Sequence, residues 1–167
     1  PINSQSPYAA TKAGADQLVK SYHYSFDLPV TILRPFNTFG PRQSMRAVIP
    51  TIITQILKGE REIKLGKLTP TRDFNFVSDT CSAFIQLLDN EKVVGKIINS
   101  ASNFEVSIEK TAFLIAKIMG VDIDIRSDEN RLRPSNSEVE RLFGDNKLLK
   151  ELTSWEPEQV YIHRSRG

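Results

Sequence analysis

A tyrosine and a lysine near the start of the chain, Tyr8 and Lys12, constrain its structure more than any other feature. Ser6 can cap a helix, and Pro7 suits the first helical position because proline lacks only an N–H that would be unpaired there. A helix is therefore predicted to begin at about Pro7. Side chains at positions i and i+4 are neighbours on a helix, so the phenol and the ammonium share one face.

The chemistry of this pair depends on the positive charge beside the phenol. A tyrosine ordinarily titrates near about 10, so it acts as a general base at neutral pH only where a nearby charge favours the phenolate. Lys12 could supply that charge and could also donate hydrogen bonds to a ribose hydroxyl of a bound nucleotide. The alternative is a solvated helix face, on which the two residue types fall at this spacing by chance.

Apolar side chains follow the pair at intervals of three and four residues, which is the spacing of a helix with one buried stripe. They are Ala15, Leu18, Val19, Tyr22 and Phe26. Beyond this helix the patterns alternate between strands and helices, which favours an α/β fold. Strands are predicted at Val30–Leu33, near Ile63 and Phe74, at Lys96–Asn99 and at Asp122–Arg126. Helices are predicted at Val48–Leu57, Ser78–Leu88 and Ser107–Met119.

Composition argues against several classes of protein. The net charge is +2, with 25% charged and 40% hydrophobic residues, and the basic residues are dispersed, so no nucleic-acid partner is predicted. No apolar run approaches the roughly 20 residues that cross a bilayer, so no membrane partner is predicted. The spacing of the single cysteine, Cys81, from neighbouring apolar residues predicts a buried structural thiol. No cluster has metal-ligand spacing, so we predict no metal.

Three motifs, in this order, resemble the extended short-chain dehydrogenase/reductase family, the NAD-dependent nucleotide-sugar epimerases and dehydratases. Ser6 to Lys12 matches Ser-Pro-Tyr-x-x-x-Lys, Arg34 to Pro41 matches Arg-Pro-x-Asn-x-x-Gly-Pro, and Arg72 to Asp79 matches Arg-Asp-aromatic-x-aromatic-Val-x-Asp. The resemblance implies the carboxyl-terminal part of a Rossmann-type NAD-binding fold plus a smaller mixed α/β substrate-binding lobe. Residues 1–45 would end the dinucleotide-binding domain, 46–159 would form mostly the sugar-nucleotide lobe, and 160–167 would be an atypical tail.

The same resemblance implies that the chain is a fragment of a longer parent protein, in which its activity is best measured. Members of the family are longer and carry a glycine-rich turn that holds the dinucleotide pyrophosphate at a helix N-terminus. The eight glycines here are scattered and form no such turn. The residues that separate dehydration from epimerisation are also expected upstream. We therefore expect the fragment to be inactive alone.

The resemblance assigns roles to individual residues. Tyr8 and Lys12 form the catalytic pair and, together with Arg34, Pro35 and Asn37, would contact NAD. The substrate-binding residues would be Asn37, Val48, Ile49, Pro50, Arg72 and Arg133, with the arginines on the diphosphate and Val48–Pro50 at the base.

Several alternatives stay open at these positions. Asn37 could instead bond a backbone turn, Val48–Pro50 could be the buried start of a helix, and Arg72 could pair with Asp73. Arg42 and Arg46 could contact the same anion or merely hold their loop.

The implied mechanism uses NAD as a transient oxidant while Tyr8, as phenolate, removes the proton from a sugar hydroxyl. In a 4,6-dehydratase the keto sugar then loses water across C5–C6 and takes back at C6 the hydride that NAD accepted. In a 4-epimerase it takes that hydride back at C4 on its other face. The individual residues within the motifs most resemble those of amino-sugar 4,6-dehydratases from legionaminic-acid-type pathways, a branch of polysaccharide biosynthesis. This resemblance implies that the substrate is a nucleotide-linked N-acetylglucosamine. A 4-epimerase and a non-catalytic sugar-nucleotide-binding remnant are the alternatives. A cytoplasmic homodimer, with Leu18, Val19 and Tyr22 facing a partner subunit, is expected for the parent.

Overall fold

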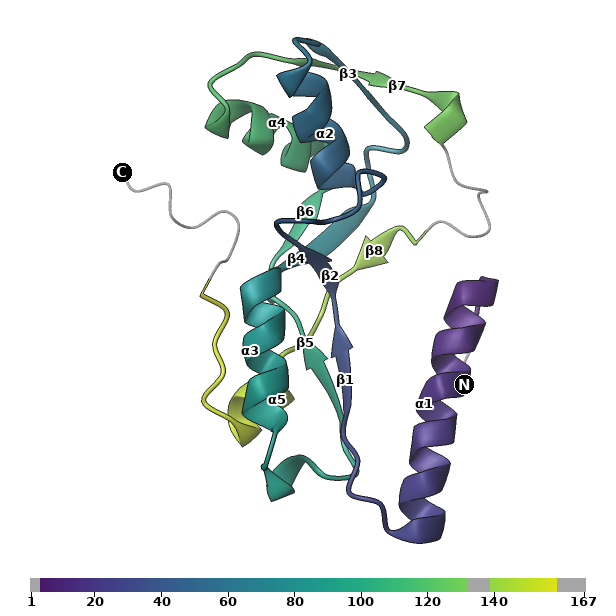
Figure 1. The fold of residues 1–167 in the computed structure, drawn as a ribbon. Coiled ribbons are helices and arrows are strands. Elements are labelled where there is room, and N and C mark those ends of the chain that lie inside the picture. The colour runs from purple at the N-terminus through teal and green to yellow at the C-terminus, as the bar shows by residue number, and fades with distance from the viewer. Residues whose placement is uncertain (1–3, 132–138, 159–167) are drawn as a thin grey trace.

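The structure, a computed structural model, describes residues 4–131 and 139–158 (Figure 1). Its first helix, α1 (Pro7–Phe26), begins where the sequence predicts. The hydroxyl of Ser6 accepts a hydrogen bond from the backbone N–H of Ala9 at 3.1 Å, and Pro7 occupies the first helical position. The helix ends at Phe26 and is followed by Asp27, whose φ of 51° lies in the left-handed region.

The predicted buried stripe of α1 is wrong for the described chain. None of the residues of α1 is buried, and Leu18 and Phe26 are 60% and 72% exposed. The reason is the position of the helix, which lies to one side of the other elements (Figure 1). An ion pair between Asp16 and Arg34 joins α1 to the first strand.

The strands form a central sheet and two smaller parallel pairs. In the central sheet, β4 (Thr71–Phe76) pairs in parallel with β2 (Asn37–Phe39) and β8 (Arg141–Leu142), and antiparallel with β6 (Glu105–Ser107). The two parallel pairs are β1 (Ile32–Pro35) with β5 (Ile97–Ser100), and β3 (Glu62–Leu65) with β7 (Asp124–Ser127). The predicted α/β class is confirmed.

The predicted helices are present within one or two residues of their expected bounds. The structure has α2 (Val48–Leu57), α3 (Val77–Leu87) and α4 (Ile108–Ile118). It also has short elements that the sequence analysis missed: β2, β6, β8, α5 (Lys147–Leu152) and the 3-10 turns η1 (Glu91–Val93) and η2 (Glu129–Arg131). Each of these has six residues or fewer, which is too short for a hydrophobic period to become visible.

Two groups of buried apolar side chains hold these elements together. The larger group fills the space between α2, α4 and the strands around β4, and includes the fully buried Ile52 and Ile63. The smaller group joins α3, β5 and α5 around Trp155, whose indole N–H donates to the carbonyl of Asp79 at 2.9 Å. The proposed division of the chain at residue 45 stays a prediction, and the predicted tail at 160–167 lies outside the described residues.

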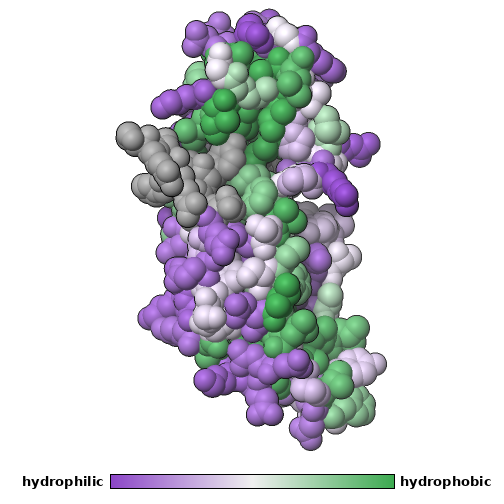
Figure 2. Space-filling view, turned by 60° about the vertical axis from the view of Figure 1, so that its left-hand side comes forward, coloured by the Kyte–Doolittle hydropathy of each residue, from purple (hydrophilic) through white to green (hydrophobic). Residues whose placement is uncertain are grey.

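The surface corrects one further expectation. Cys81 is exposed on α3, so the prediction of a buried thiol is wrong. Its neighbours Thr80 and Ala83 face the interior in its place. Figure 2 shows apolar surface interrupting the hydrophilic surface on one face of the molecule. Among the described residues, no helix combines the length and apolar character that crossing a membrane requires.

A buried carboxylate on β4 connects segments that are distant in sequence. Asp73 is fully buried, and one of its oxygens accepts hydrogen bonds from the backbone N–H and the hydroxyl of Ser102, at 2.8 and 2.7 Å. Its other oxygen accepts from the backbone N–H groups of Asn103 and Gly144, at 3.1 and 3.2 Å. A Cβ at Gly144 would lie 2.3 Å from that of Ala101, so only glycine allows this close approach.

We predict that Asp73→Asn lowers the free energy of unfolding by about 2–4 kcal/mol, because hydrogen bonds to a charged acceptor are each worth about 1.5–3 kcal/mol. An amide keeps one acceptor and turns a donor toward N–H groups. Urea denaturation followed by circular dichroism measures the change. The matched control is Asp122→Asn on an exposed residue, which should shift the free energy by less than about 0.5 kcal/mol. Equal shifts in the two variants would contradict the role of Asp73.

Candidate active site

An open cleft of about 970 Å³ lies where α1, the ends of β1 and β2, the start of α2 and the connection from β3 to β4 meet. In the described part of the chain, its lining contains five basic side chains and no acidic one. The basic residues are Arg34, Arg46, Lys67, Arg72 and Arg131. A cleft lined by charges of one sign concentrates the field and attracts a ligand of the opposite sign. The lining therefore favours an anionic ligand.

Three of the basic side chains are held by carboxylates that are not part of the lining. Arg34 pairs with Asp16 at 2.5 Å, Lys67 pairs with Glu140, and Arg131 pairs with Asp128 at 3.2 Å. The first two pairs join the cleft wall to α1 and to the residue before β8, and the third lies within the turn that forms η2. The carboxylates restrict where the cationic groups lie without placing negative charge in the cleft.

The predicted catalytic pair lies at the edge of the cleft. Tyr8 is part of the lining and is 72% exposed, so its ring is accessible from the cleft and from solvent. Lys12 follows one turn later on α1, is exposed, and is not part of the lining. The structure therefore brings Tyr8 to the cleft, with Lys12 beside it on the same helix.

The residues predicted after the first helix gather at the end of β1. Arg34, Pro35 and Asn37 all line the cleft. The guanidinium of Arg34 donates twice to Asp16, from Nε at 2.8 Å and from Nη2 at 2.5 Å. The amide nitrogen of Asn37 is buried and has no hydrogen-bond partner within the described chain. A buried donor without an acceptor is costly, so this amide suits the oxygen of a ligand.

The segment predicted to contact a nucleobase divides between the cleft and the core. Val48 lines the cleft, whereas Ile49 is 6% exposed and belongs to the larger apolar group. Pro50 is partly buried and is not part of the lining. The N-cap of α2, Ala47, makes no side-chain hydrogen bond to the first turn of the helix. A contact between this segment and a base stays a prediction.

The two arginines predicted to bind a diphosphate differ in what the structure describes. Arg72 lines the cleft, and its Nη1 donates to the carbonyls of Thr71 and Val139 at 2.8 and 2.7 Å. Asp73, the partner weighed for Arg72, directs its carboxylate to Ser102 and the other donors named above. Arg133 lies outside the described residues.

Three basic residues of the cleft lining were either left undecided by the sequence or not predicted from it. Of the two arginines left open, Arg46 lines the cleft, and Arg42 does not; Arg42 sits in a turn with φ of 68°. Lys67 and Arg131 were not predicted as site residues. Both lie in irregular segments, Lys67 after β3 and Arg131 at the end of η2, where no periodicity indicates which way a side chain points.

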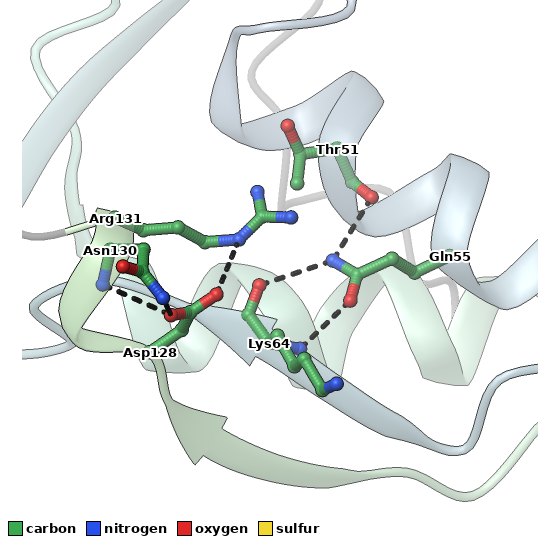
Figure 3. Close-up of polar contacts among 6 residues, drawn as sticks. All are labelled: Thr51, Gln55, Lys64, Asp128, Asn130 and Arg131. Atoms are coloured by element: carbon green, nitrogen blue, oxygen red, sulfur yellow. Dashed lines mark hydrogen bonds and ion pairs between the residues drawn. The ribbon is translucent and has the colours of Figure 1, made fainter.

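Figure 3 shows how Arg131 and the neighbouring wall of the cleft are fixed. The carboxylate of Asp128 accepts hydrogen bonds from the backbone and side-chain nitrogens of Asn130, at 3.0 and 3.2 Å, and from Nε of Arg131 at 3.2 Å. Across from them, the buried amide of Gln55 bonds both the N–H and the carbonyl of Lys64, at 2.8 and 3.2 Å. Gln55 thereby joins α2 to β3.

Hydrogen bonds within this turn lower the pKa of Asp128 below its ordinary value of 3.8, and the backbone N–H of Asn130 is the largest cause. The Asn130 side chain and Arg131 lower it further, while partial burial opposes them.

No group of three or more histidine, cysteine, aspartate and glutamate side chains in the described chain could hold a metal ion.

Comparisons with known proteins agree with this architecture. A family model described as GDP-mannose 4,6 dehydratase matches residues 1–162. The low-salt glycan biosynthesis protein Agl12 of Haloferax volcanii is similar, at 36% identity over 159 residues, which is 95% of this chain and 49% of that protein. The chain thus spans about half the length of the curated relatives it matches.

Two solved structures are similar in fold. The dTDP-glucose 4,6-dehydratase of Bacillus anthracis in complex with NAD gives a TM-score of 0.82 at 29% identity, covering 95% of this chain and 49% of that one. The UDP-glucuronic acid 4-epimerase of Bacillus cereus in complex with UDP-glucuronic acid and NAD also gives 0.82, at 28% identity, covering 94% of this chain and 49% of that one. Both are Rossmann-type enzymes, so the predicted fold is confirmed for the half that this chain spans.

We predict that the carboxyl carbon of Asp128 titrates below pH 3.8 in a carbon-detected NMR experiment. The pKa of Asp128 is lower in the folded protein than in the unfolded chain. The stabilisation that this turn adds to the folded state is therefore complete above pH 3.8 and is lost as the pH falls through the lowered pKa. Arg131→Met should raise the pKa of Asp128 only part of the way back toward 3.8, because the hydrogen bond from the Asn130 backbone N–H, which is the larger cause of the lowering, remains. A titration of the unaltered protein at 3.8 or above would contradict the geometry of the turn.

Proposed function

Because the chain belongs to the GDP-mannose 4,6-dehydratase family, we propose that it supplies the catalytic helix and the sugar-nucleotide lobe of an NAD-dependent nucleotide-sugar 4,6-dehydratase. The observation that carries the proposal is the cleft, with five basic and no acidic side chains in its described lining and Tyr8 at its edge. A sugar diphosphate is an anion that such a lining attracts. Tyr8 would then face the sugar end of the bound molecule.

The residues at the end of β1 are suited to hold NAD beside that sugar. Tyr8 and Lys12 are exposed on α1, and the unpaired amide of Asn37 offers a donor to an oxygen of the cofactor or the substrate. Arg34 and Pro35 complete the edge of the cleft. When bound, NAD supplies reversible hydride acceptance. In this proposal residues 1–45 belong to the cofactor-binding domain and residues 46–159 mostly to the substrate lobe.

The chain's own residues would then accept the proton of a sugar hydroxyl and bind the diphosphate of the substrate. Tyr8 would take the proton of a sugar hydroxyl at its phenolic oxygen, and Lys12, one turn further on, would keep positive charge beside it. Arg72 and Arg133 would bind the diphosphate, because a guanidinium matches two phosphate oxygens at once. The backbone of Val48–Pro50 would contact the base.

The finer assignment is a nucleotide-linked N-acetylglucosamine as substrate, in a cytoplasmic homodimer. The sugar rests on the resemblance of the three motifs to amino-sugar dehydratases of polysaccharide biosynthesis. The dimer is supported by the exposed apolar side chains of α1, where Leu18 and Tyr22 are 60% and 49% exposed. A helix that leaves such residues uncovered in one chain offers a surface for a partner subunit.

A 4-epimerase is the second candidate, because a solved epimerase is as similar in fold as a solved dehydratase. The two reactions share the oxidation step and differ in what happens to the keto sugar. A third candidate, a non-catalytic protein that binds a sugar nucleotide, needs only the cleft. Product analysis separates all three.

We predict that the full-length parent converts GDP- or UDP-N-acetylglucosamine to a 4-keto-6-deoxy sugar, detected by NMR. Tyr8→Phe should lower the rate about 10²- to 10⁴-fold, because the variant cannot take the hydroxyl proton. Tyr24→Phe, on a tyrosine of the same helix that is 75% exposed, is the control and should retain the parent's rate. A product inverted at C4 would establish the epimerase, and no turnover with any sugar nucleotide would leave only binding.

We also predict that Arg72→Lys weakens the binding of GDP and UDP alike by about tenfold, because an ammonium cannot pair with two phosphate oxygens in the fork geometry of a guanidinium. Isothermal titration calorimetry gives the dissociation constants. Arg61→Lys changes an exposed arginine that is not part of the cleft lining and should leave both constants unchanged. The diphosphate role of Arg72 is wrong if the two variants bind equally well.

A further inference from the structure

We propose that Arg131 recognises the nucleobase of the bound sugar nucleotide and selects guanine. The inference rests on the proposed function, because it assumes that a nucleoside diphosphate sugar occupies the cleft. It adds the residue that reads the base and the class of nucleotide that the residue favours.

The position of Arg131 along the cleft places it away from the reacting sugar. Tyr8 and Asn37 line the cleft where α1 and the end of β1 meet, whereas Gly66 and Arg131 line it beside β3 and β7. Figure 1 shows α1 beside β1, and the β3–β7 pair at the opposite end of the molecule. The covalent order of the ligand is sugar, diphosphate, nucleoside. With the sugar at Tyr8, the base lies at the end that contains Arg131.

The backbone of Arg131 is fixed against the end of β3. The N–H of Asp128 donates to the carbonyl of Leu65 at 2.7 Å, and the N–H of Arg131 donates to the carbonyl of Asp128 at 3.0 Å. A Cβ built on Gly66 would lie 2.5 Å from the carbonyl oxygen of Arg131, a distance that real Cβ atoms do not reach. Glycine at position 66 therefore allows the backbone of Arg131 to sit directly on the cleft wall.

The side chain of Arg131 is also held before any ligand binds. Its Nε donates a hydrogen bond to Oδ2 of Asp128. The other oxygen of Asp128 accepts hydrogen bonds from the backbone and side-chain nitrogens of Asn130. Three of the carboxylate's acceptor positions are thus occupied within the turn. A guanidinium fixed in this way loses less conformational entropy when it binds than a freely rotating one.

The remaining donors of Arg131 match one base better than the others. Within the described chain, its two Nη groups make no hydrogen bond, and its side chain is 44% exposed. Figure 3 shows the guanidinium pointing toward α2, where Thr51 lies. Two parallel donors pair with two adjacent acceptors, which guanine presents as N7 and O6. Adenine and cytosine present an amino group there, and uracil or thymine presents a single acceptor beside C5.

Calorimetric titration of the full chain with four nucleotides tests the inference: GDP, IDP, 7-deaza-GDP and UDP. IDP retains N7 and O6 but lacks the 2-amino group, whereas 7-deaza-GDP lacks N7. We expect GDP and IDP to bind alike, UDP to bind about tenfold or more weakly, and 7-deaza-GDP to fall between them. Arg131→Met should reduce the affinity for GDP to that for UDP and leave UDP binding unchanged.

The control is Arg126→Met, which changes an exposed arginine of β7 that pairs with Glu62 and does not line the cleft. It should alter neither affinity. The inference would be overturned if the unaltered protein bound UDP as tightly as GDP or more tightly. It would also be overturned if Arg131→Met lost equal affinity for GDP and UDP, because Arg131 would then be a ligand of the diphosphate. If neither nucleotide binds the unaltered protein, the proposed function of the cleft fails, and this inference fails with it.

Discussion

The structure depends on one buried carboxylate. Asp73 lies on β4, the strand that pairs with β2, β6 and β8, and its two oxygens accept hydrogen bonds from the turn between β5 and β6 and from Gly144. A buried charge is tolerable only when its hydrogen-bonding capacity is filled, so these segments must come together for β4 to be buried. The adjacent residue, Arg72, is thereby placed in the cleft wall. Fold and site are connected at this point of the chain.

Long periodic elements were predictable, and short or exposed ones were not. The bounds of α2 were predicted to the residue, since ten residues show a helical period, but the three residues of β2 do not. Cys81 was misplaced because helical spacing alone does not fix which side of α3 packs inward. In the site, motif resemblance selected Tyr8, Asn37 and Arg72, all of which reach the cleft. Arg131 was missed because its position depends on tertiary contacts with Gly66 and Asp128.

The electrostatics of the cleft explain how so many cations can be gathered without instability. Arg34, Lys67 and Arg131 are paired with carboxylates outside the lining, so the mutual repulsion of the basic groups is reduced while the described lining stays free of acidic side chains. A diphosphate would complete the neutralisation from the cleft side. The unpaired amide of Asn37 adds a neutral donor to the lining that also contains Tyr8. This arrangement suits an anionic ligand that also carries hydroxyl groups.

The most direct test of the proposed cleft is to locate where a nucleoside diphosphate binds on this chain. Titration with GDP, followed by backbone amide shifts in ¹H–¹⁵N NMR spectra, locates the site without requiring turnover. Saturable shifts are expected at the amides of Arg46, Thr51, Lys67 and Arg72, which line the cleft. Unchanged spectra, or shifts centred instead on the separate groove lined by Leu33 of β1 and by Phe84 and Leu87 of α3, would contradict binding in the cleft.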